Sequence, residues 1–424
     1  MCLKILIITV IVDMNIKKKL AKAFLIKSIF ISWSIDSSLA MENKVKMGGI
    51  YDFQAIHYNN NGNPDQRMVS IRNKEFGFYT SGNIFVDYQL IAENANLYGA
   101  KISLEHTSVN DRAVPFFVYI ESKLGRVEGG AESSAGKKMR INGYSASCGP
   151  GNGWNSRVIT SPSNPLKPSE KLIPYITNFC SFLDSKTRTS LKSDYSRKIT
   201  YFTPKMALAE KHHIQLGISY IPDSSNMGHD DINVDRQNPP VVSPKYKFVI
   251  KDGISYGITY TGKFPDKLEA KLSFVGEYGK THAFNKADNT KSSIKFKNLN
   301  TYVIGGILTY EKISFSAAYG NYNKSLTAKE VDLISRDSYV YGYGAKYTMG
   351  QYAFSINQFH SNHKKNKLNV TSLGIDYDVA KGLKTYIQTN FYQAKGNYIQ
   401  EGSNAVKSNK NHGVLTFLGT KISF

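Results

Sequence analysis

Hydrophobic and polar residues alternate with a period of two over most of the chain. In residues 254–261 the bulky side chains fall on one set of alternate positions, and small or hydroxyl side chains fall on the other. Residues 268–278 and 372–377 repeat this pattern. A period of two is that of a β-strand with two different faces. The pattern predicts sixteen strands, at about 44–58, 74–91, 96–106, 114–123, 126–130, 195–204, 211–221, 248–262, 266–280, 297–310, 312–323, 338–348, 351–361, 367–378, 382–394 and 412–424.

The lengths of the connections distinguish between two β architectures. A soluble β-sandwich gives the same alternation along each strand. Short joints alternating with mostly longer polar connections are typical of an up-and-down membrane barrel. The longer connections include 59–73, 222–247, 281–296, 324–337 and 395–411. Seven joints are tight, around Asn94, Gly125, Ala207, Phe264, Glu311, Gly350 and Ala380. The sequence therefore predicts an all-β fold, a transmembrane antiparallel β-barrel.

The last predicted strand, 412–424, alternates cleanly and ends on an aromatic residue, Phe424. A barrel needs such a strand, because the last strand must pair with the first so that no open edge meets lipid. An ordinary edge strand is the alternative interpretation of this stretch alone.

Composition is compatible with a barrel. The 424 residues contain no run of about 18 apolar residues, which a membrane-spanning helix would need. The mean hydropathy of −0.34 does not argue against a barrel, because only alternate residues face lipid. The 28 Tyr residues suit the aromatic girdles of a barrel, although tyrosine is also a good strand former.

The net charge of +21 does not indicate nucleic-acid binding. Only 10 of the 54 basic residues are Arg, the residue best suited to bidentate contacts with phosphates and bases. The lysines are spread along the chain rather than gathered in one block. We therefore expect no nucleic-acid partner.

Residues 1–40 have the features of a signal peptide. A basic segment, Lys17–Lys19, follows Met14 and precedes an apolar stretch at 23–33, and small residues at Ser38 and Ala40 suggest cleavage after Ala40. We expect translation to start at Met14 and the barrel domain to occupy 41–424.

Several short motifs resemble the Gram-negative general diffusion porins. Residues 118–131 (VYIESKLGRVEGGA) look like the tight turn and short strand that lead into the inward loop of that family, and 195–205 with 216–223 are similar to the strands that leave it. Residues 48–51 resemble the family's first strand, and Phe424 its terminal assembly signal. The chain departs from the family in having no evident acidic cluster in the loop.

The resemblance implies a sixteen-stranded, trimeric porin of the outer membrane, assembled by the barrel assembly machinery and surrounded by outer-membrane lipid. Its function would be passive diffusion of ions and small hydrophilic solutes through a water-filled channel. The constriction loop, 131–194, would fold into the lumen. The loop residues that we predict to line the constriction are Glu132, Lys137, Lys138, Arg140, Arg157, Glu170, Asp184 and Arg188.

Alternation predicts the inward residues of the wall, if the apolar positions face lipid. These are Lys101, Glu105, Glu269, Lys271, Lys346, Asp376, Lys384 and Lys421. Between positions 132 and 194 nine Lys or Arg residues stand against four acids, a balance of +5. Fixed positive charge at a constriction enriches anions, so we expect a weak anion preference. Lysines pointing outward instead would leave little selectivity.

Cys148 and Cys180 both lie in the loop, and in an exported protein two cysteines indicate one disulfide. On the chain-entropy model, closing the loop between them would contribute about 3–4 kcal/mol. Two free thiols are the alternative. We also expect the apolar segment 173–183 to pack on the wall as a short helix.

No catalytic constellation or cofactor motif stands out, so we predict a protein that is not an enzyme and needs no cofactor. His360 and His363 could both approach a metal, but two ligands do not make a site, and none is predicted. A surface antigen or adhesin with a plugged lumen is the alternative function.

Overall fold

The computed structural model describes residues 42–60, 76–107, 110–150, 163–164, 167–171, 179, 183, 196–224, 246–285, 290–326, 338–363, 366–399 and 406–424. The predicted signal peptide lies outside the described residues. Within the described part of the chain, no helix has the length and apolar character needed to cross a membrane.

The described chain consists of β-strands and one short helix. Long strands follow from the period-two alternation, and the helix interrupts the connection after the fifth strand. The elements are β1 (Glu42–Asn60), β2 (Phe76–Ile91), β3 (Leu97–Thr107), β4 (Asn110–Ser122), β5 (Gly125–Ala131), α1 (Ala135–Met139), β6 (Ser163–Asn164), β7 (Lys167–Lys171), β8 (Arg197–Phe202), β9 (Met206–Ala209), β10 (His212–Asp223), β11 (Tyr246–Lys263), β12 (Leu268–Asn285), β13 (Leu299–Tyr310), β14 (Ile313–Asn323), β15 (Ser338–Met349), β16 (Tyr352–His363), β17 (Asn366–Ala380), β18 (Leu383–Ile399) and β19 (Val406–Ser423).

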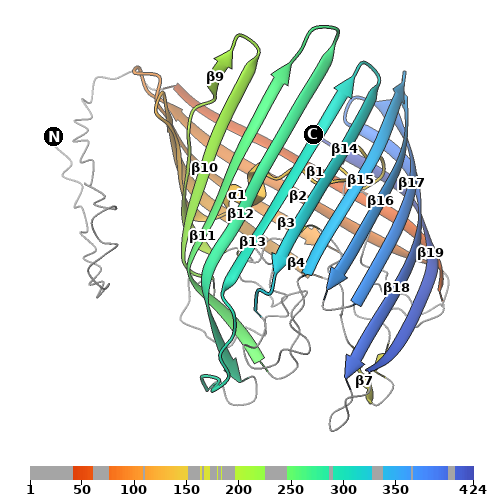
Figure 1. Cartoon of the computed structure of the whole chain (residues 1–424). Coiled ribbons are helices and arrows are strands. Elements are labelled where there is room, and N and C mark those ends of the chain that lie inside the picture. The colour runs from red at the N-terminus through yellow and green to blue at the C-terminus, as the bar shows by residue number, and fades with distance from the viewer. Residues whose placement is uncertain are drawn as a thin grey trace. The chain divides into compact units, whose positions relative to one another are not determined.

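The strands form one closed antiparallel sheet (Figure 1). Closure is shown by β1, which pairs with both β2 and β19. The sheet has seventeen segments among the described residues, but β8 and β9 follow each other and both pair with β10. They make one strand of the wall, which leaves sixteen. The predicted sixteen-stranded antiparallel barrel is confirmed.

The gap between β8 and β9 lies at Pro204, which has no N–H to donate to a sheet ladder. Beside this gap the Thr203 hydroxyl accepts a hydrogen bond from the Leu216 N–H at 3.0 Å, which gives that N–H an acceptor where the ladder is interrupted. The strand then resumes as β9, and the tight turn falls at 210–211 rather than around Ala207. The predicted position of this joint is therefore wrong by about one short strand segment.

The barrel closes through a reciprocal pair of backbone hydrogen bonds at its last residue. The Gly49 N–H donates to the Phe424 carbonyl at 2.9 Å, and the Phe424 N–H donates to the Gly49 carbonyl at 3.1 Å. The Phe424 side chain is 68% exposed on the outer surface. Phe424 thus extends the ladder between β1 and β19 and adds an aromatic ring to the lipid-facing wall.

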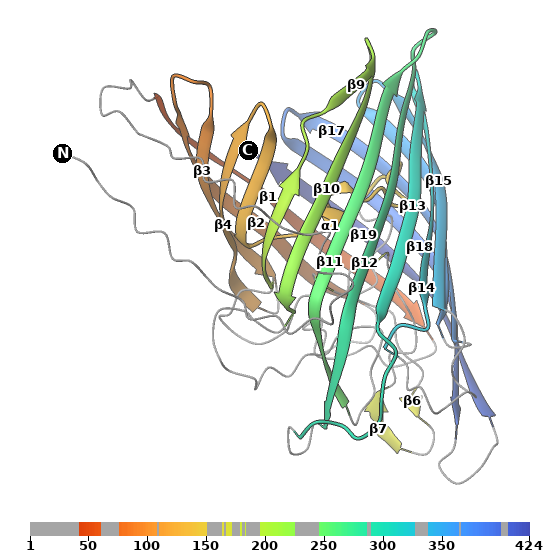
Figure 2. The ribbon, with the colours of Figure 1, turned by 60° about the vertical axis from the view of Figure 1, so that its left-hand side comes forward.

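The two rims of the barrel differ, as the connection lengths predict. The tight turns gather at one rim, and the helix α1 lies within the barrel wall's circumference (Figure 2). The connections at the other rim are mostly longer, although only two residues separate β3 from β4 and β16 from β17. By the general rule for outer-membrane barrels, the rim of short turns is periplasmic.

Candidate functional site: the inner wall and its loop

The two faces of each strand carry different chemistry. On neighbouring strands Ile218, Ile254 and Leu272 are exposed on the outside. The alternate positions carry serines that are buried, among them Ser219 and Ser255. An apolar outer surface with a polar inner surface is the arrangement of a water-containing barrel in lipid.

The first part of the loop after β5 lies along the inner wall. Its backbone N–H groups donate to side chains on β10, β11, β12, β14, β16 and β17. Ala135 donates to Ser219 on β10 at 2.7 Å and Gly136 to Ser255 on β11 at 3.1 Å. The row continues with Ile141 to Ser273, Ala146 to Ser316 and Cys148 to Ser355, at 2.9–3.0 Å. It ends where the Gly149 N–H donates to the Asp376 carboxylate on β17 at 2.7 Å. We call these six wall residues the anchor row.

The anchor row explains how an irregular segment can be held inside the barrel. Buried backbone N–H groups need acceptors, and a loop has no sheet ladder to supply them. A serine hydroxyl is short, so each bond holds the loop close to the wall. The Ser316 hydroxyl also donates to the Gly143 carbonyl at 2.8 Å, so it pairs with both a donor and an acceptor of the loop backbone.

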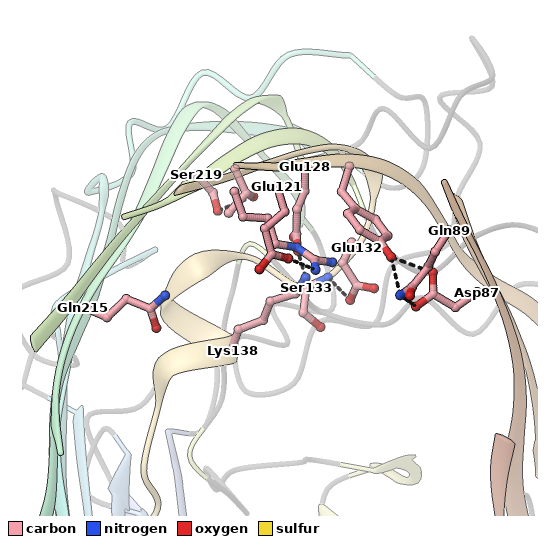
Figure 3. A network of polar contacts seen from close by, with 12 residues as sticks. Asp87, Gln89, Glu121, Glu128, Glu132, Ser133, Lys138, Gln215 and Ser219 are labelled. Carbon is pink, nitrogen blue, oxygen red and sulfur yellow. Dashed lines mark hydrogen bonds and ion pairs between the residues drawn. The ribbon is translucent and has the colours of Figure 1, made fainter. Parts of the chain in front are cut away.

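Charged side chains gather where the loop leaves β5 (Figure 3). The Glu128 carboxylate accepts from Arg126 Nε at 2.9 Å and from Lys138 Nζ on α1 at 2.5 Å. Arg126 also contacts Glu121 at 3.1 Å. Lys198 on β8 is buried and donates to the Glu132 carbonyl. Arg126 and Lys138 therefore share two carboxylates, whereas Lys198 is held by a backbone carbonyl.

A tyrosine on β4 reaches across β3 to β2. Gln89, Gly99 and Tyr119 lie side by side in the register. The Tyr119 hydroxyl donates to Asp87 at 2.8 Å, and the Gln89 amide donates to the Tyr119 oxygen at 2.9 Å. A Cβ on Gly99 would lie 2.2 Å from the Tyr119 ring, so only glycine fits beneath it.

The same arrangement recurs at the barrel closure. Gln54 on β1, Gly419 on β19 and Tyr386 on β18 again form one row. The Tyr386 hydroxyl donates to Asp52 at 2.6 Å, and the Gln54 amide donates to the same carboxylate at 2.8 Å. A Cβ on Gly419 would also lie 2.2 Å from the tyrosine ring. Each motif joins three strands through side chains on the inner face.

Comparison with known proteins gives the family. A sequence profile described as "Gram-negative porin" matches residues 34–397, most of the chain. The chain belongs to the Gram-negative porin family. Porins are channels of the outer membrane and not enzymes, which confirms the predicted family, fold and location.

The relatives of this porin by sequence include uncharacterized proteins of two Rickettsia species. That of Rickettsia conorii is 30% identical and that of Rickettsia prowazekii 29%, and each alignment covers 90% of this chain and 93% of the relative. Among solved structures, the anion-selective porin from Comamonas acidovorans is similar with a TM-score of 0.54 and 13% identity. The match covers 90% of this chain and all of that one. At this identity the likeness concerns the fold alone.

The porin places most of the predicted wall residues on the strand positions that alternate with the exposed apolar series. The register pairs Lys101 with Asp87, Lys346 with Ser355 and Lys421 with Asp52. Glu105 pairs with Asn83 in the register, but its side chain is outside the described part of the structure. The residues on inward positions are Lys101, Glu269, Lys271, Lys346, Asp376, Lys384 and Lys421. Their role in lining the pore stays a prediction.

Two wall residues have a further role that the sequence did not suggest. Asp376, predicted to line the pore, is 5% exposed and belongs to the anchor row. It also accepts from Lys384 at 3.1 Å. Glu269 pairs with Lys263 at 2.9 Å near the rim of short turns.

The predicted loop residues divide between described and undescribed parts. Glu132, Lys137, Lys138 and Arg140 lie in the described segment along the wall. Arg140 makes no ion pair with any described residue. Arg157, Asp184 and Arg188, together with the side chain of Glu170, lie outside the described residues, so no position is assigned to them.

Cys148 is buried, and no described residue forms a disulfide with it. Its predicted partner, Cys180, lies outside the described residues, so the pairing stays a prediction. Two residues of the apolar segment 173–183 are described: Phe179 packs on Tyr144 and Phe359, and Leu183 is 2% exposed. Neither residue lies in a helix, and the rest of that segment lies outside the described part.

The two histidines considered as metal ligands have other partners. His360 Nδ1 lies 2.9 Å from the Asn369 amide oxygen, and His363 Nδ1 lies 2.8 Å from the Ser338 hydroxyl. Among the described residues no group of three or more His, Cys, Asp or Glu side chains could hold a metal ion.

Sequence reasoning missed the anchor row and both tyrosine motifs. A signal for the motifs existed: Asp-x-Gln occurs at matching places in β1 and β2, as 52–54 and 87–89. The anchor row left a weaker signal, since serines recur on the polar face of successive strands.

Proposed function

We propose that this porin forms a water-filled channel for passive diffusion of ions and small hydrophilic solutes across the outer membrane. The observation that supports it best is the anchor row. A sixteen-stranded barrel is wide enough to enclose an aqueous lumen. A loop bound flat along the wall from β10 to β17 narrows such a lumen without needing to cross it. The bound loop then acts as a sieve.

We further propose a weak preference for anions. The charge balance of +5 in the loop overstates the field, because Lys138 is matched by Glu128 on the wall. Lys346 and Lys421 lie on inward positions without an ion pair to any described residue, and Arg140 adds a third such charge. The anion selectivity stated for the Comamonas acidovorans porin agrees in sign.

We also propose a homotrimer, because porins of this family are typically trimeric. The proposal does not rest on contacts of this chain. Native mass spectrometry of the extracted protein would measure the copy number, with a mass of three chains expected. A monomer in the gentlest detergent that preserves activity would contradict it.

Planar-bilayer recording of the refolded protein tests the channel. We expect discrete, voltage-independent conductance steps at low voltage and a reversal potential of anion-selective sign under a KCl gradient. Uptake rates of uncharged sugars into liposomes should fall steadily with sugar size. A folded barrel without conductance would instead support the surface antigen with a plugged lumen. The same protein unfolded by heating is the control.

A further inference from the structure

One large apolar side chain is exposed on the inner face of the barrel. Ile50 is 45% exposed, and the register pairs it with Ser423 on β19 and with Asn83 on β2. Both partners are inward, because they alternate with Ile422 and Ile84 on the outer surface. The other exposed large apolar side chains of the described residues lie on the outer face or at the rims. Apolar surface left in water costs free energy, so the exposure of Ile50 to the lumen points to a role in binding.

Phe85 extends this apolar surface on the neighbouring strand. Its ring covers Gly48, where a Cβ would lie 2.8 Å from the ring edge. Phe85 is partly exposed, whereas Phe117 and Tyr119 on the inner face of β4 are 3% and 2% exposed. Ile50 lies two residues beyond Gly48, so Ile50 and Phe85 form one surface about 7 Å long along the strands. We call these two residues the apolar patch.

Two lysines flank the apolar patch on the side of the short turns. The register places Asp87 between Lys46 on β1 and Lys101 on β3, one inward position from Phe85. The Lys101 ammonium lies 4.3 Å from the centroid of the Phe85 ring, which is a cation–π contact. Neither lysine makes an ion pair with any residue that the structure describes. This end of the patch therefore offers two ammonium groups to a solute.

The carboxylates beside these lysines are held by other donors. Asp87 accepts from the Tyr119 hydroxyl at 2.8 Å and from the Gln89 amide at 2.9 Å (Figure 3). Asp52, on the far side of the patch, is 6% exposed and accepts from the Tyr386 hydroxyl at 2.6 Å. Both acids are thus bound within the wall, and the lysine ammonium groups remain available.

The other end of the apolar patch also carries a cation. Lys421 on β19 lies opposite Asp52, one inward position beyond Ile50. It makes no ion pair within the described part of the chain. An ammonium group forms strong hydrogen bonds with a carboxylate, so an anionic group can bind at either end of the patch.

We propose that the apolar patch binds organic anions that carry one carboxylate on an apolar body, such as aromatic acids. The carboxylate binds Lys46 and Lys101 or, at the other end, Lys421, and the body lies on Ile50 and Phe85. This inference rests on the proposed channel and names the class of solute that it prefers. A length of about 7 Å suits one aromatic ring. An inorganic anion contacts only the lysines, and an uncharged apolar solute only the patch.

Planar-bilayer recording of the refolded protein at pH 7.5 measures how far three probes reduce the KCl current. Benzoate has both the carboxylate and the apolar body, acetate has the carboxylate without the ring, and benzyl alcohol has the ring without the charge. We expect benzoate to reduce the current in a saturable way. Half of its maximal effect should occur at a concentration at least tenfold below that of either other probe.

An apolar variant assigns this preference to the patch. Ile50→Ser removes the exposed apolar group and should reduce the preference for benzoate over acetate from at least tenfold to less than threefold. Ile84→Ser is the matched control, because it makes the same change at a residue 49% exposed on the outer face of the next strand. The control should keep the full preference. Equal losses in the two variants would overturn the proposal.

A charge variant tests the lysines. Lys46→Gln/Lys101→Gln should raise the half-maximal benzoate concentration at least tenfold. Lys123→Gln/Lys205→Gln removes the same charge at exposed positions on the rim of short turns and should leave that concentration within twofold of wild type. An unchanged benzoate effect in the first variant would contradict the assignment.

Failure of the binding site can be told apart from failure of the channel. A wild-type protein that conducts KCl and responds equally to benzoate and acetate overturns the inference and leaves the proposed channel intact. A protein that passes no KCl current contradicts the channel. Saturation-transfer difference NMR of benzoate with the detergent-purified protein then measures binding without any current. Absence of a transfer signal that depends on Ile50 would overturn the binding site as well.

Discussion

The Tyr119 hydroxyl lies 2.8 Å from the Asp87 carboxylate although a whole strand, β3, separates their backbones. The bond is possible because Gly99 leaves room for the ring. Since Tyr386 reaches Asp52 over Gly419 in the same way, the barrel has two side-chain ties that bridge three strands each. These ties join β1, β2, β3, β4, β18 and β19, and none of these strands carries a residue of the anchor row.

Removing the hydroxyl in Tyr119→Phe should lower the stability of the barrel. A hydrogen bond to a charged group contributes about 1.5–3 kcal/mol, and the carboxylate would stay behind with one donor fewer. The temperature at which the folded band disappears on a gel should fall. Tyr343→Phe is the matched control, because that hydroxyl is on the outer surface and 53% of the residue is exposed. Equal melting of both variants would show that the tie contributes nothing.

The triple variant Ser273→Ala/Ser316→Ala/Ser355→Ala should loosen the loop. Each change leaves one loop N–H without its acceptor, at a cost of about 1–3 kcal/mol per site. We expect larger current fluctuations and a higher mean conductance in bilayer recordings. Ser103→Ala is the control, since Ser103 is buried on the inner face of β3 and is not part of the anchor row. Wild-type current fluctuations and wild-type mean conductance in the triple variant would contradict the role of the anchor row.

Charge reversal at Arg140 should shift the reversal potential towards cation selectivity. Arg140 is the informative loop position, because Lys138→Glu would also place a second acid beside Glu128 and disturb the cluster. A negative charge in place of a positive one beside the ion path attracts cations, which gives the sign of the shift. Charges act on passing ions over a screening length of about 10 Å at 0.1 M salt. Lys205→Glu, near the rim, is the control. If both variants give the wild-type potential, Arg140 does not lie beside the path.

Deleting Phe424 should reduce the amount of folded porin in the outer membrane several-fold, while the molecules that do assemble conduct normally. The deletion removes two backbone hydrogen bonds to Gly49 and the exposed ring on the closing strand. Immunoblots of unheated membrane fractions measure the folded fraction. Phe424→Tyr keeps the aromatic ring and should assemble at the wild-type level. Wild-type levels of the deletion variant would remove Phe424 from the assembly signal.

The predicted Cys148–Cys180 disulfide is tested by mass spectrometry of non-reduced peptides from protein isolated from membranes. A linked pair is expected. Because Cys148 is buried, alkylation must be done on unfolded, unreduced protein. Two alkylated thiols under those conditions would show that the disulfide does not form.

Sequence alternation was sufficient to predict the wall, because period two and connection length are local properties. The error around Ala207 arose from Pro204, where the strand pauses and then continues, and pattern alone reads the pause as a turn. The path of the loop could not be predicted. Its bonds join residues such as Gly149 and Asp376, 227 positions apart, and any of many inward serines could have served as acceptor.

The sequence also could not show which charges cancel. Lys138 is counted in the loop's charge of +5 and Glu128 on β5 is not, yet the structure places their charged atoms 2.5 Å apart. The inward set of wall residues, by contrast, followed from the face of each strand. The direction of a side chain is thus easier to predict than its partner.

The hydrogen bonds of the anchor row are donated by backbone N–H groups of the loop. Every residue except proline has such a group. The side chains of Met139 and Tyr144 are buried and also hold the loop, whereas Arg140 and Ser145 are not buried and take no part in the anchor-row bonds. Substitutions at positions such as Arg140 can therefore alter the lumen's charge while the attachment persists. The selectivity of the pore and the attachment of its loop can therefore evolve independently. Relatives of this chain can differ in the solutes that they let through while the same backbone hydrogen bonds hold the loop.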